Sequence, residues 1–237
     1  MVGKTGWVSA RIATEEAFVE TAALVGAQLK YRWTELEPRR GDYDLSAIRH
    51  DLAVLERRGK RLFIQLQDVS FVEARPNVPD YLLAQPEFHG GVAAQYFHPD
   101  NDQSRVAFDA WVPRRWDPAV RARLAALFQA LAAEFDGKIA GINFAETSIG
   151  FDSAGEPPEG YTPAAYYEAM RDLMRSARAA FRKSDLLIYA NFMPGESLPE
   201  ELAAYARDPL HLDYLFWGTE EPYWSEAVVP YLRSLKP

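Results

Sequence analysis

The chain contains the segment Ile139-Ala-Gly-Ile-Asn-Phe-Ala-Glu-Thr147, an apolar run that ends in an amide, Asn143, and a carboxylate, Glu146. An amphipathic segment from Pro118 to Phe135 precedes it and is closed by Asp136-Gly137, so the sequence predicts a helix, a short turn and a buried strand. A helix followed by a strand with a polar C-terminal end is the repeating unit of α/β barrels, whose active sites gather at that end. Glu146 is therefore the first candidate for a catalytic residue.

The same succession of strands and helices extends along the chain. Strands are expected at residues 7–12, 27–34, 61–67, 139–147, 186–192 and 212–217. Helices are expected at residues 14–23, 46–58, 118–135, 163–182, 198–206 and 225–235. This order predicts the α/β class and a (β/α)8 TIM-barrel-like architecture in which about six strands are recognisable.

A complete barrel needs more strands than these. About twenty residues separate Asn191 from Leu212, which leaves room for one short helix but not for two further units of about 30 residues each. Either the barrel is incomplete, or further strands lie in the Pro-rich and poorly periodic segment 69–117. As a long loop, that segment is expected to form a lid or a wall over the site, inserted into a single domain that spans residues 1–237.

Composition and charge exclude several classes of function. The chain has 237 residues, of which 48% are hydrophobic, enough for a sizeable core. Its net charge is -8 and its basic residues are dispersed among acidic ones, so a neutral or cationic small molecule is expected rather than nucleic acid. No apolar run reaches the ~18 residues of a membrane span, and residues 1–7 lack the apolar core of a signal peptide. We expect a soluble protein, either cytoplasmic or exported with its signal removed.

Metal and cofactor chemistry has little support in the composition. The chain has no cysteine and four histidines, none of them spaced four residues from another, so thiolate nucleophiles and His-rich metal centres are not expected. We therefore expect no metal and no cofactor. Aromatic residues make up 13% of the chain, which favours sugar binding slightly because aromatic rings stack on the apolar faces of pyranose rings.

Several segments resemble the clan of (β/α)8 glycoside hydrolases that use two glutamates, which includes β-galactosidase-like and xylanase-like members. Tyr31-Arg-Trp-Thr-Glu-Leu-Glu-Pro-Arg-Arg-Gly-Asp-Tyr-Asp-Leu45 is similar to their W-x-x-x-E-P-x-x-G-x-Y-D-F segment after the second strand, and Val78-Pro-Asp-Tyr-Leu-Leu83 to their P-x-W-L region. The segment 139–147 resembles their fourth strand, and Phe216-Trp217 resembles the strand that carries a tryptophan under the sugar. The chain also resembles shortened barrel proteins of this kind whose activity is only inferred.

The resemblance implies hydrolysis of a glycosidic bond with Glu146 as the general acid/base. In the clan an Asn directly precedes that glutamate, whereas here Asn143 lies three residues before it, on the opposite face of a regular strand unless the strand end is bulged. The clan's nucleophile follows the seventh strand, and the sequence offers no recognisable counterpart of that strand. Glu220 and Glu221, in Trp217-Gly-Thr-Glu-Glu-Pro222, are the nearest candidates for the second catalytic carboxylate.

Seven residues at predicted strand ends are candidates for substrate binding: Arg32, Trp33, Gln65, Gln67, Asn143, Asn191 and Trp217. Arg32 either holds a catalytic carboxylate by a charge-assisted bond or is a structural ion-pair partner. Trp217 either forms the floor of a sugar subsite or plugs the barrel. Alternation along the strand places Gln65 and Gln67 on one face and Asp68 on the other.

Two further readings of the chain stay open beside a glycoside hydrolase. A carbohydrate-binding barrel that lost its nucleophile would keep the aromatic and amide residues, whereas a metal-dependent sugar isomerase is disfavoured because it needs clustered His and acidic ligands. The expected partner is a small molecule or an oligosaccharide, and an exposed sheet edge would favour a homo-oligomer. Glu35 and Glu37 are expected to be acids of a turn and of the surface.

Overall fold

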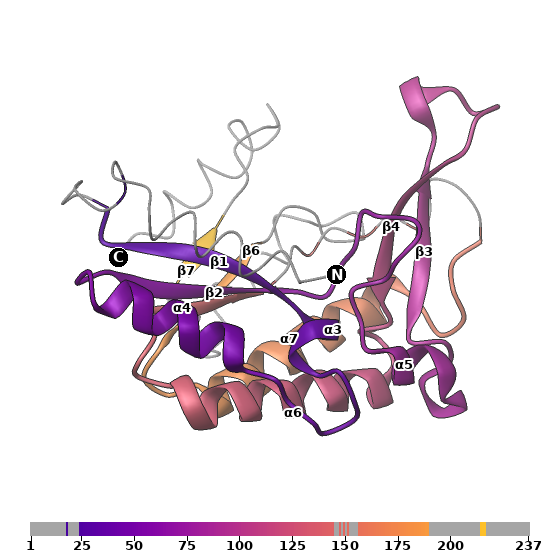
Figure 1. Cartoon of the computed structure of the whole chain (residues 1–237). Coiled ribbons are helices and arrows are strands. Elements are labelled where there is room, and N and C mark those ends of the chain that lie inside the picture. Colours follow the sequence, from indigo (N-terminus) through magenta and orange to yellow (C-terminus); the bar gives the residue numbers. More distant parts are fainter. Residues whose placement is uncertain are drawn as a thin grey trace, which may run out of the picture.

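The computed structural model describes residues 18, 24–144, 147, 149, 151, 156–189 and 214–216, and a parallel sheet organises them. Its five strands stand in the order β1 (Gly26–Arg32), β2 (Arg61–Gln67), β5 (Gly141–Phe144), β6 (Asp185–Tyr189) and β7 (Tyr214–Phe216). Figure 1 shows three helices on one side of this sheet: α4 (Ser46–Glu56), α6 (Pro118–Phe135) and α7 (Pro163–Ala180). The described sheet thus holds five of the eight strands of a complete barrel.

The elements follow the sequence pattern closely. Five of the predicted strands and three of the predicted helices are present, and the bounds of α6 and β2 are as predicted. The last two residues of the strand predicted at 27–34 belong instead to a short helix, α3 (Trp33–Leu36). The elements predicted at 7–12, 198–206 and 225–235 lie outside the described residues, and so does the helix predicted at 14–23 apart from residue 18.

The two faces of the sheet differ in polarity. Along β2, Leu62, Ile64 and Leu66 are buried on the face that the helices cover, and on β5 the ring of Phe144 packs edge-to-face on Phe128 of α6 at 5.1 Å. Residues of the other parity, among them Gln65, point to the opposite face. In a closed barrel that opposite face is the interior.

Gly141 lets three strands approach one another closely at the start of β5. A Cβ atom at this position would lie 2.6 Å from the Phe63 ring on β2 and would clash with the carbonyl oxygen of Asp185 on β6. Any larger residue would therefore push β2 or β6 away from β5, which explains a glycine inside a buried strand.

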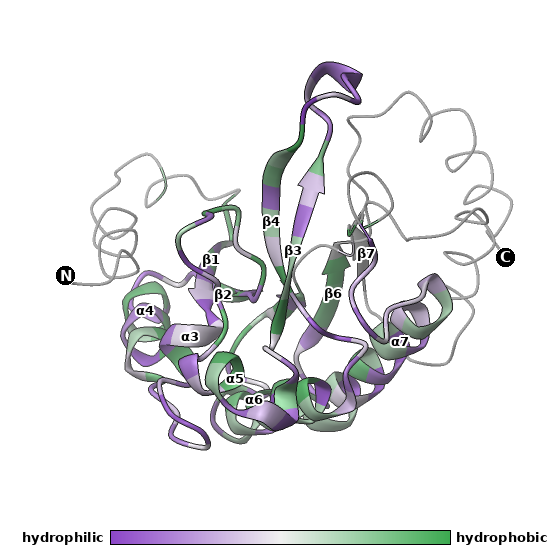
Figure 2. Cartoon of the chain, turned by 90° about the vertical axis from the view of Figure 1, so that its right-hand side faces the viewer, coloured by the Kyte–Doolittle hydropathy of each residue, from purple (hydrophilic) through white to green (hydrophobic). Residues whose placement is uncertain are grey.

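The segment 69–117 is not the irregular loop that its composition predicts. It contains α5 (Asp80–Ala84), two 3-10 turns, η1 (Pro86–Phe88) and η2 (Pro99–Asn101), and an antiparallel hairpin of β3 (Val92–Phe97) and β4 (Ala107–Pro113). Because this hairpin forms a separate two-stranded sheet, its strands do not complete the barrel. In Figures 1 and 2 the hairpin rises from the end of the sheet at which β1 runs into α3, and its tip is hydrophilic.

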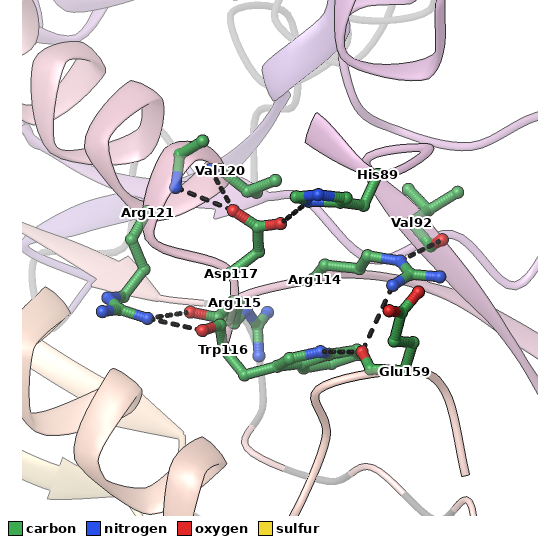
Figure 3. A network of polar contacts seen from close by, with 10 residues as sticks. His89, Val92, Arg114, Arg115, Trp116, Asp117, Val120, Arg121 and Glu159 are labelled. Atoms are coloured by element: carbon green, nitrogen blue, oxygen red, sulfur yellow. Dashed lines mark hydrogen bonds and ion pairs between the residues drawn. The ribbon is translucent and has the colours of Figure 1, made fainter. Parts of the chain in front are cut away.

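The hairpin is fixed at its base, where β4 runs into α6 (Figure 3). Asp117 caps α6 by accepting from the backbone N–H groups of Ala119 and Val120, and it also lies 2.6 Å from His89 Nδ1. Arg114 donates to the carbonyl oxygens of Val92 and Glu159, at 3.3 and 3.4 Å. These bonds tie the base of the hairpin to the start of α6 and to the connection before α7.

Asp136, directly after α6, is expected to be a stabilising anion. Its carboxylate accepts hydrogen bonds of 2.9–3.0 Å from the backbone N–H groups of Arg182, Lys183 and Ser184 before β6. Partial burial raises the pKa of Asp136, but these backbone bonds outweigh it and the net pKa is lowered. We predict that Asp136→Ala lowers the free energy of unfolding by about 2 kcal/mol at pH 7.

This contribution has a defined pH dependence. Because the folded-state pKa of Asp136 is lowered, its stabilisation is complete above the ordinary aspartate pKa of about 3.9 and is lost as the pH falls through the folded-state value. Urea denaturation at pH 7 and near pH 3 measures the difference between wild type and variant, and Asp42→Ala, which removes an exposed surface partner of Arg39, is the control. A variant-to-wild-type difference that stays constant down to pH 3 would contradict the prediction.

Candidate functional site

The open face of the sheet gathers polar residues from three neighbouring strands. Lys30, Gln65 and Asn143 are cross-strand partners on β1, β2 and β5, and Arg32 pairs with Gln67 one step further toward the strand ends. Four of the predicted substrate-binding residues, Arg32, Gln65, Gln67 and Asn143, therefore share one face. Amide and guanidinium groups in such a row suit a ligand that is rich in hydroxyl groups.

Asn143 has unused hydrogen-bonding capacity within this row. Its side chain is 3% exposed, and in the described part of the chain its Oδ1 atom is buried and accepts no hydrogen bond. Gln65 differs, because its Oε1 atom accepts from Gln28 Nε2 at 2.9 Å. An unsatisfied buried acceptor of this kind costs about 1–3 kcal/mol.

Arg32 has an ion-pair partner in the structure, as its predicted structural role requires. Its Nη1 atom donates to Glu35 Oε1 at 3.1 Å, and both side chains are partly exposed, at 41% and 30%. A solvent-exposed pair of this kind contributes little stability, about 0–1 kcal/mol.

The segment that resembles glycoside hydrolases, residues 31–45, folds around a buried carboxylate. Glu37 accepts from Trp33 Nε1 and from the backbone N–H group of Gly41, both at 2.9 Å. Arg123 of α6 also donates to Glu37, and at 3.1 Å to the hydroxyl of Tyr43. Trp33, Glu37, Gly41 and Tyr43 are the residues that carry the resemblance, and here they hold the connection after β1 against α6.

This network corrects the expectation that Glu37 is a surface acid, and it also involves Trp33, a predicted substrate-binding residue. Glu37 is fully buried rather than a surface acid, because Arg123 and two N–H groups compensate its charge. Trp33 is also fully buried, which leaves no face of its ring accessible to a ligand. Nearby, burial raises the pKa of Tyr81 to about 12, although its hydrogen bond with Arg123 lowers it.

A second buried network joins the end of β2 to α7. Asp68 accepts two hydrogen bonds from Arg115, from Nε at 3.0 Å and from Nη2 at 2.7 Å, and lies on the helix-covered side, opposite Gln65 and Gln67. Arg115 Nη1 donates to the hydroxyl of Tyr166 at 2.9 Å. Sequence patterns gave no signal for these partners, since Arg115 follows Asp68 by 47 positions and precedes Tyr166 by 51.

Five predicted site residues lie outside the described residues, so their geometry is not part of the structure: Glu146, Glu220, Glu221, Asn191 and Trp217. Among the residues that are described, no group of three or more His, Asp and Glu side chains is placed to hold a metal ion. No described helix combines the length and apolarity that crossing a membrane requires.

Comparison with known proteins identifies the class of fold. No family model and no curated protein sequence matches the chain. The structure is similar to the catalytic domain of β-amylase from Paenibacillus polymyxa, with a TM-score of 0.57 and 9% identity over 80% of this chain and 64% of that one. Xylanase 10B from Thermotoga petrophila RKU-1 and from Thermotoga maritima give TM-scores of 0.43 and 0.45 and identities of 11% and 12%; they match 75% and 77% of this chain and 45% and 47% of their own.

These comparisons concern the fold alone. The chain spans less than two thirds of the length of each of these structures. Together with the parallel sheet and its helical layer, the likeness to the β-amylase domain defines an α/β protein with a TIM-barrel-like fold. The predicted fold class is thereby confirmed.

The buried Glu37 network makes a prediction about stability. Glu37→Gln keeps the side-chain volume but removes the charge that compensates Arg123, and we expect the free energy of unfolding to fall by about 3–5 kcal/mol. The matched control is Glu35→Gln, two residues earlier, which breaks only a solvent-exposed pair and is expected to cost less than about 1 kcal/mol. Chemical denaturation measures both; equal losses would show that burial of Glu37 is not what stabilises this connection.

Proposed function

We propose that the protein hydrolyses glycosidic bonds, with Glu146 as the general acid/base. The observation that carries this proposal is that β5, in a parallel sheet of TIM-barrel-like fold, ends at Phe144, so that in the sequence Glu146 comes two positions after the C-terminal edge of the sheet. Active sites of barrel enzymes lie at this edge. The polar row on the open face, with the unpaired Oδ1 atom of Asn143, supplies groups that bind sugar hydroxyls there.

The proposed substrate is an oligosaccharide that lies across the ends of β1, β2 and β5. Gln65, Gln67 and Asn143 are its proposed hydroxyl-binding residues, and Arg32, on the same face of the sheet, is a fourth proposed contact. Asn191 and Trp217 belong to the same proposed site by their places at the ends of the fifth and sixth predicted strands. No step of this hydrolysis requires a metal or a cofactor, because two carboxyl groups suffice.

The second carboxylate is proposed to be Glu220 or Glu221. A retaining enzyme needs the two carboxyl groups about 5–5.5 Å apart, and an inverting enzyme about 6.5–9.5 Å apart. Among the described residues, the acids nearest to the ends of β1 and β2 are already engaged, Glu35 by Arg32 and Asp68 by Arg115. This favours an acid from the region after β7 and makes the two adjacent glutamates the candidates.

A non-catalytic carbohydrate-binding barrel is the second candidate function. It is favoured by the same observation, since neither Glu35 nor Asp68 is free to act as a second carboxylate. Such a protein would keep the polar row of Gln65, Gln67 and Asn143 and would bind sugars without cleaving them.

Association of two or more copies of the chain through an edge of the sheet is also proposed. Light scattering, which measures the mass of the particle in solution, tests it.

Hydrolysis of a panel of aryl glycosides tests the proposed activity. We predict that Glu146→Gln lowers kcat by about 10²–10⁴-fold, the usual contribution of a general acid or base. Glu156→Gln, an exposed glutamate of the same connection between β5 and α7, is the matched control and is expected to retain the wild-type rate. Of Glu220→Gln and Glu221→Gln, one is expected to lose activity; equal rates in wild type and Glu146→Gln would refute the assignment.

Binding measurements separate the two candidate functions. We predict that Asn143→Ala weakens oligosaccharide binding, measured by titration calorimetry, by about 1–3 kcal/mol, because it removes the unpaired acceptor on the open face. Glu146→Gln is expected to bind as wild type does but not to cleave. Sugar binding without turnover by wild type would identify the binding barrel, and unchanged affinity in Asn143→Ala would remove Asn143 from the site.

A further inference from the structure

A buried chain of hydrogen bonds leads from the end of β2 to the residue that follows Glu146. Asp68 and Arg115 are 3% and 2% exposed, and Arg115 bridges from Asp68 to the hydroxyl of Tyr166. Tyr166 in turn donates to the backbone carbonyl oxygen of Thr147 at 3.0 Å. Tyr166 and Thr147 are fully buried, so the whole chain is shielded from water.

The donor and acceptor roles along this chain are determined by chemistry. A guanidinium group is a donor only, so the Tyr166 oxygen accepts from Arg115. The hydroxyl has one proton, which is therefore directed to the Thr147 carbonyl oxygen. Burial lowers the pKa of Arg115, but Asp68 and Tyr166 outweigh burial and raise it, so the guanidinium stays charged and cannot reverse its role.

The surroundings of this chain of hydrogen bonds are apolar, so burying its charged groups is costly if they serve only to stabilise the fold. Apolar side chains of β2, β5, α6 and α7 line the space beside Asp68 and Arg115: Leu66, Phe144, Leu124, Met170, Leu173 and Met174. A buried ion pair in such a place is often no more stabilising than apolar residues of the same volume, whereas it does fix geometry. At this location, the geometry in question is that of the backbone where it leaves β5.

We infer that Tyr166 is a positioning residue that, held by Arg115 and Asp68, fixes the backbone at Thr147 and thereby the exit of β5 that carries Glu146. The inference rests on the proposed function, in which Glu146 is the general acid/base. It matters for catalysis because a displacement of about 1 Å at a reacting group can cost about 10²-fold in rate. Tyr166 acts through Thr147 and does not contact the substrate.

Tyr166→Phe tests the inference, because it removes one oxygen atom and keeps the ring. Hydrogen exchange of the backbone amides in residues 144–151 is expected to become about tenfold faster, since the carbonyl of Thr147 loses the hydrogen bond from Tyr166. With a glycoside that wild type hydrolyses, kcat is expected to fall about tenfold to 10²-fold with KM unchanged within about twofold. Tyr167→Phe, the next residue of α7, is the matched control and is expected to change neither.

The outcomes separate this inference from the proposed function. Exchange in 144–151 that equals wild type overturns the inference whatever the activity, and so does a rise in KM with kcat unchanged. Faster exchange in a protein with no glycosidase activity supports the positioning of the β5 exit and refutes the proposed function. Should Tyr166→Phe not fold, Asp68→Asn weakens the hold on Arg115 from the other end of the chain; it is expected to speed exchange in the same residues, and unchanged exchange there overturns the inference.

Discussion

Burial of one face of β2 and β5 determines where the amides of Gln65 and Asn143 point. Leu62, Ile64, Leu66, Ile142 and Phe144 are buried on the face toward the helices, and burying each contributes about 1.5–3 kcal/mol. A slip of one residue would turn all of them outward, so the register is held by apolar burial. The amides of Gln65 and Asn143 lie on the open face as a consequence of that burial. Their placement needs no interaction of their own.

The segments that follow β1 and β2 are both bound by arginines at or near the start of α6. Arg123 of α6 binds the carboxylate of Glu37 after β1, and Arg115, just before the helix, binds Asp68 after β2. The charges of these two buried carboxylates, Glu37 and Asp68, are thus compensated by arginines from one short stretch of the sequence. The positions of both connections, and hence the edge of the sheet where a barrel binds its substrate, depend on how α6 begins.

Much of the fold is predictable because it depends on local periodicity. Alternation gives β2, and apolar spacing with Asp117 and Pro118 gives the start of α6. The hairpin of β3 and β4 is missed because the polar run between its strands is long and a bulge at Gln95 breaks the alternation. The burial of Glu37 is equally invisible in sequence, since its partner Arg123 lies 86 positions away. Alternation does predict the shared face of Gln65 and Gln67, whereas the assignment of Glu146 rests on position along the chain.

The separateness of the β3–β4 hairpin has a consequence for how this chain can vary. Its strands pair with each other and not with the parallel sheet, and its contacts with the start of α6 are confined to its base. Lengthening or shortening the hydrophilic tip at residues 98–105 therefore leaves the register of β1, β2 and β5 untouched. The β3–β4 hairpin is in this sense a module, free to diversify in length and sequence while the parallel sheet stays constant.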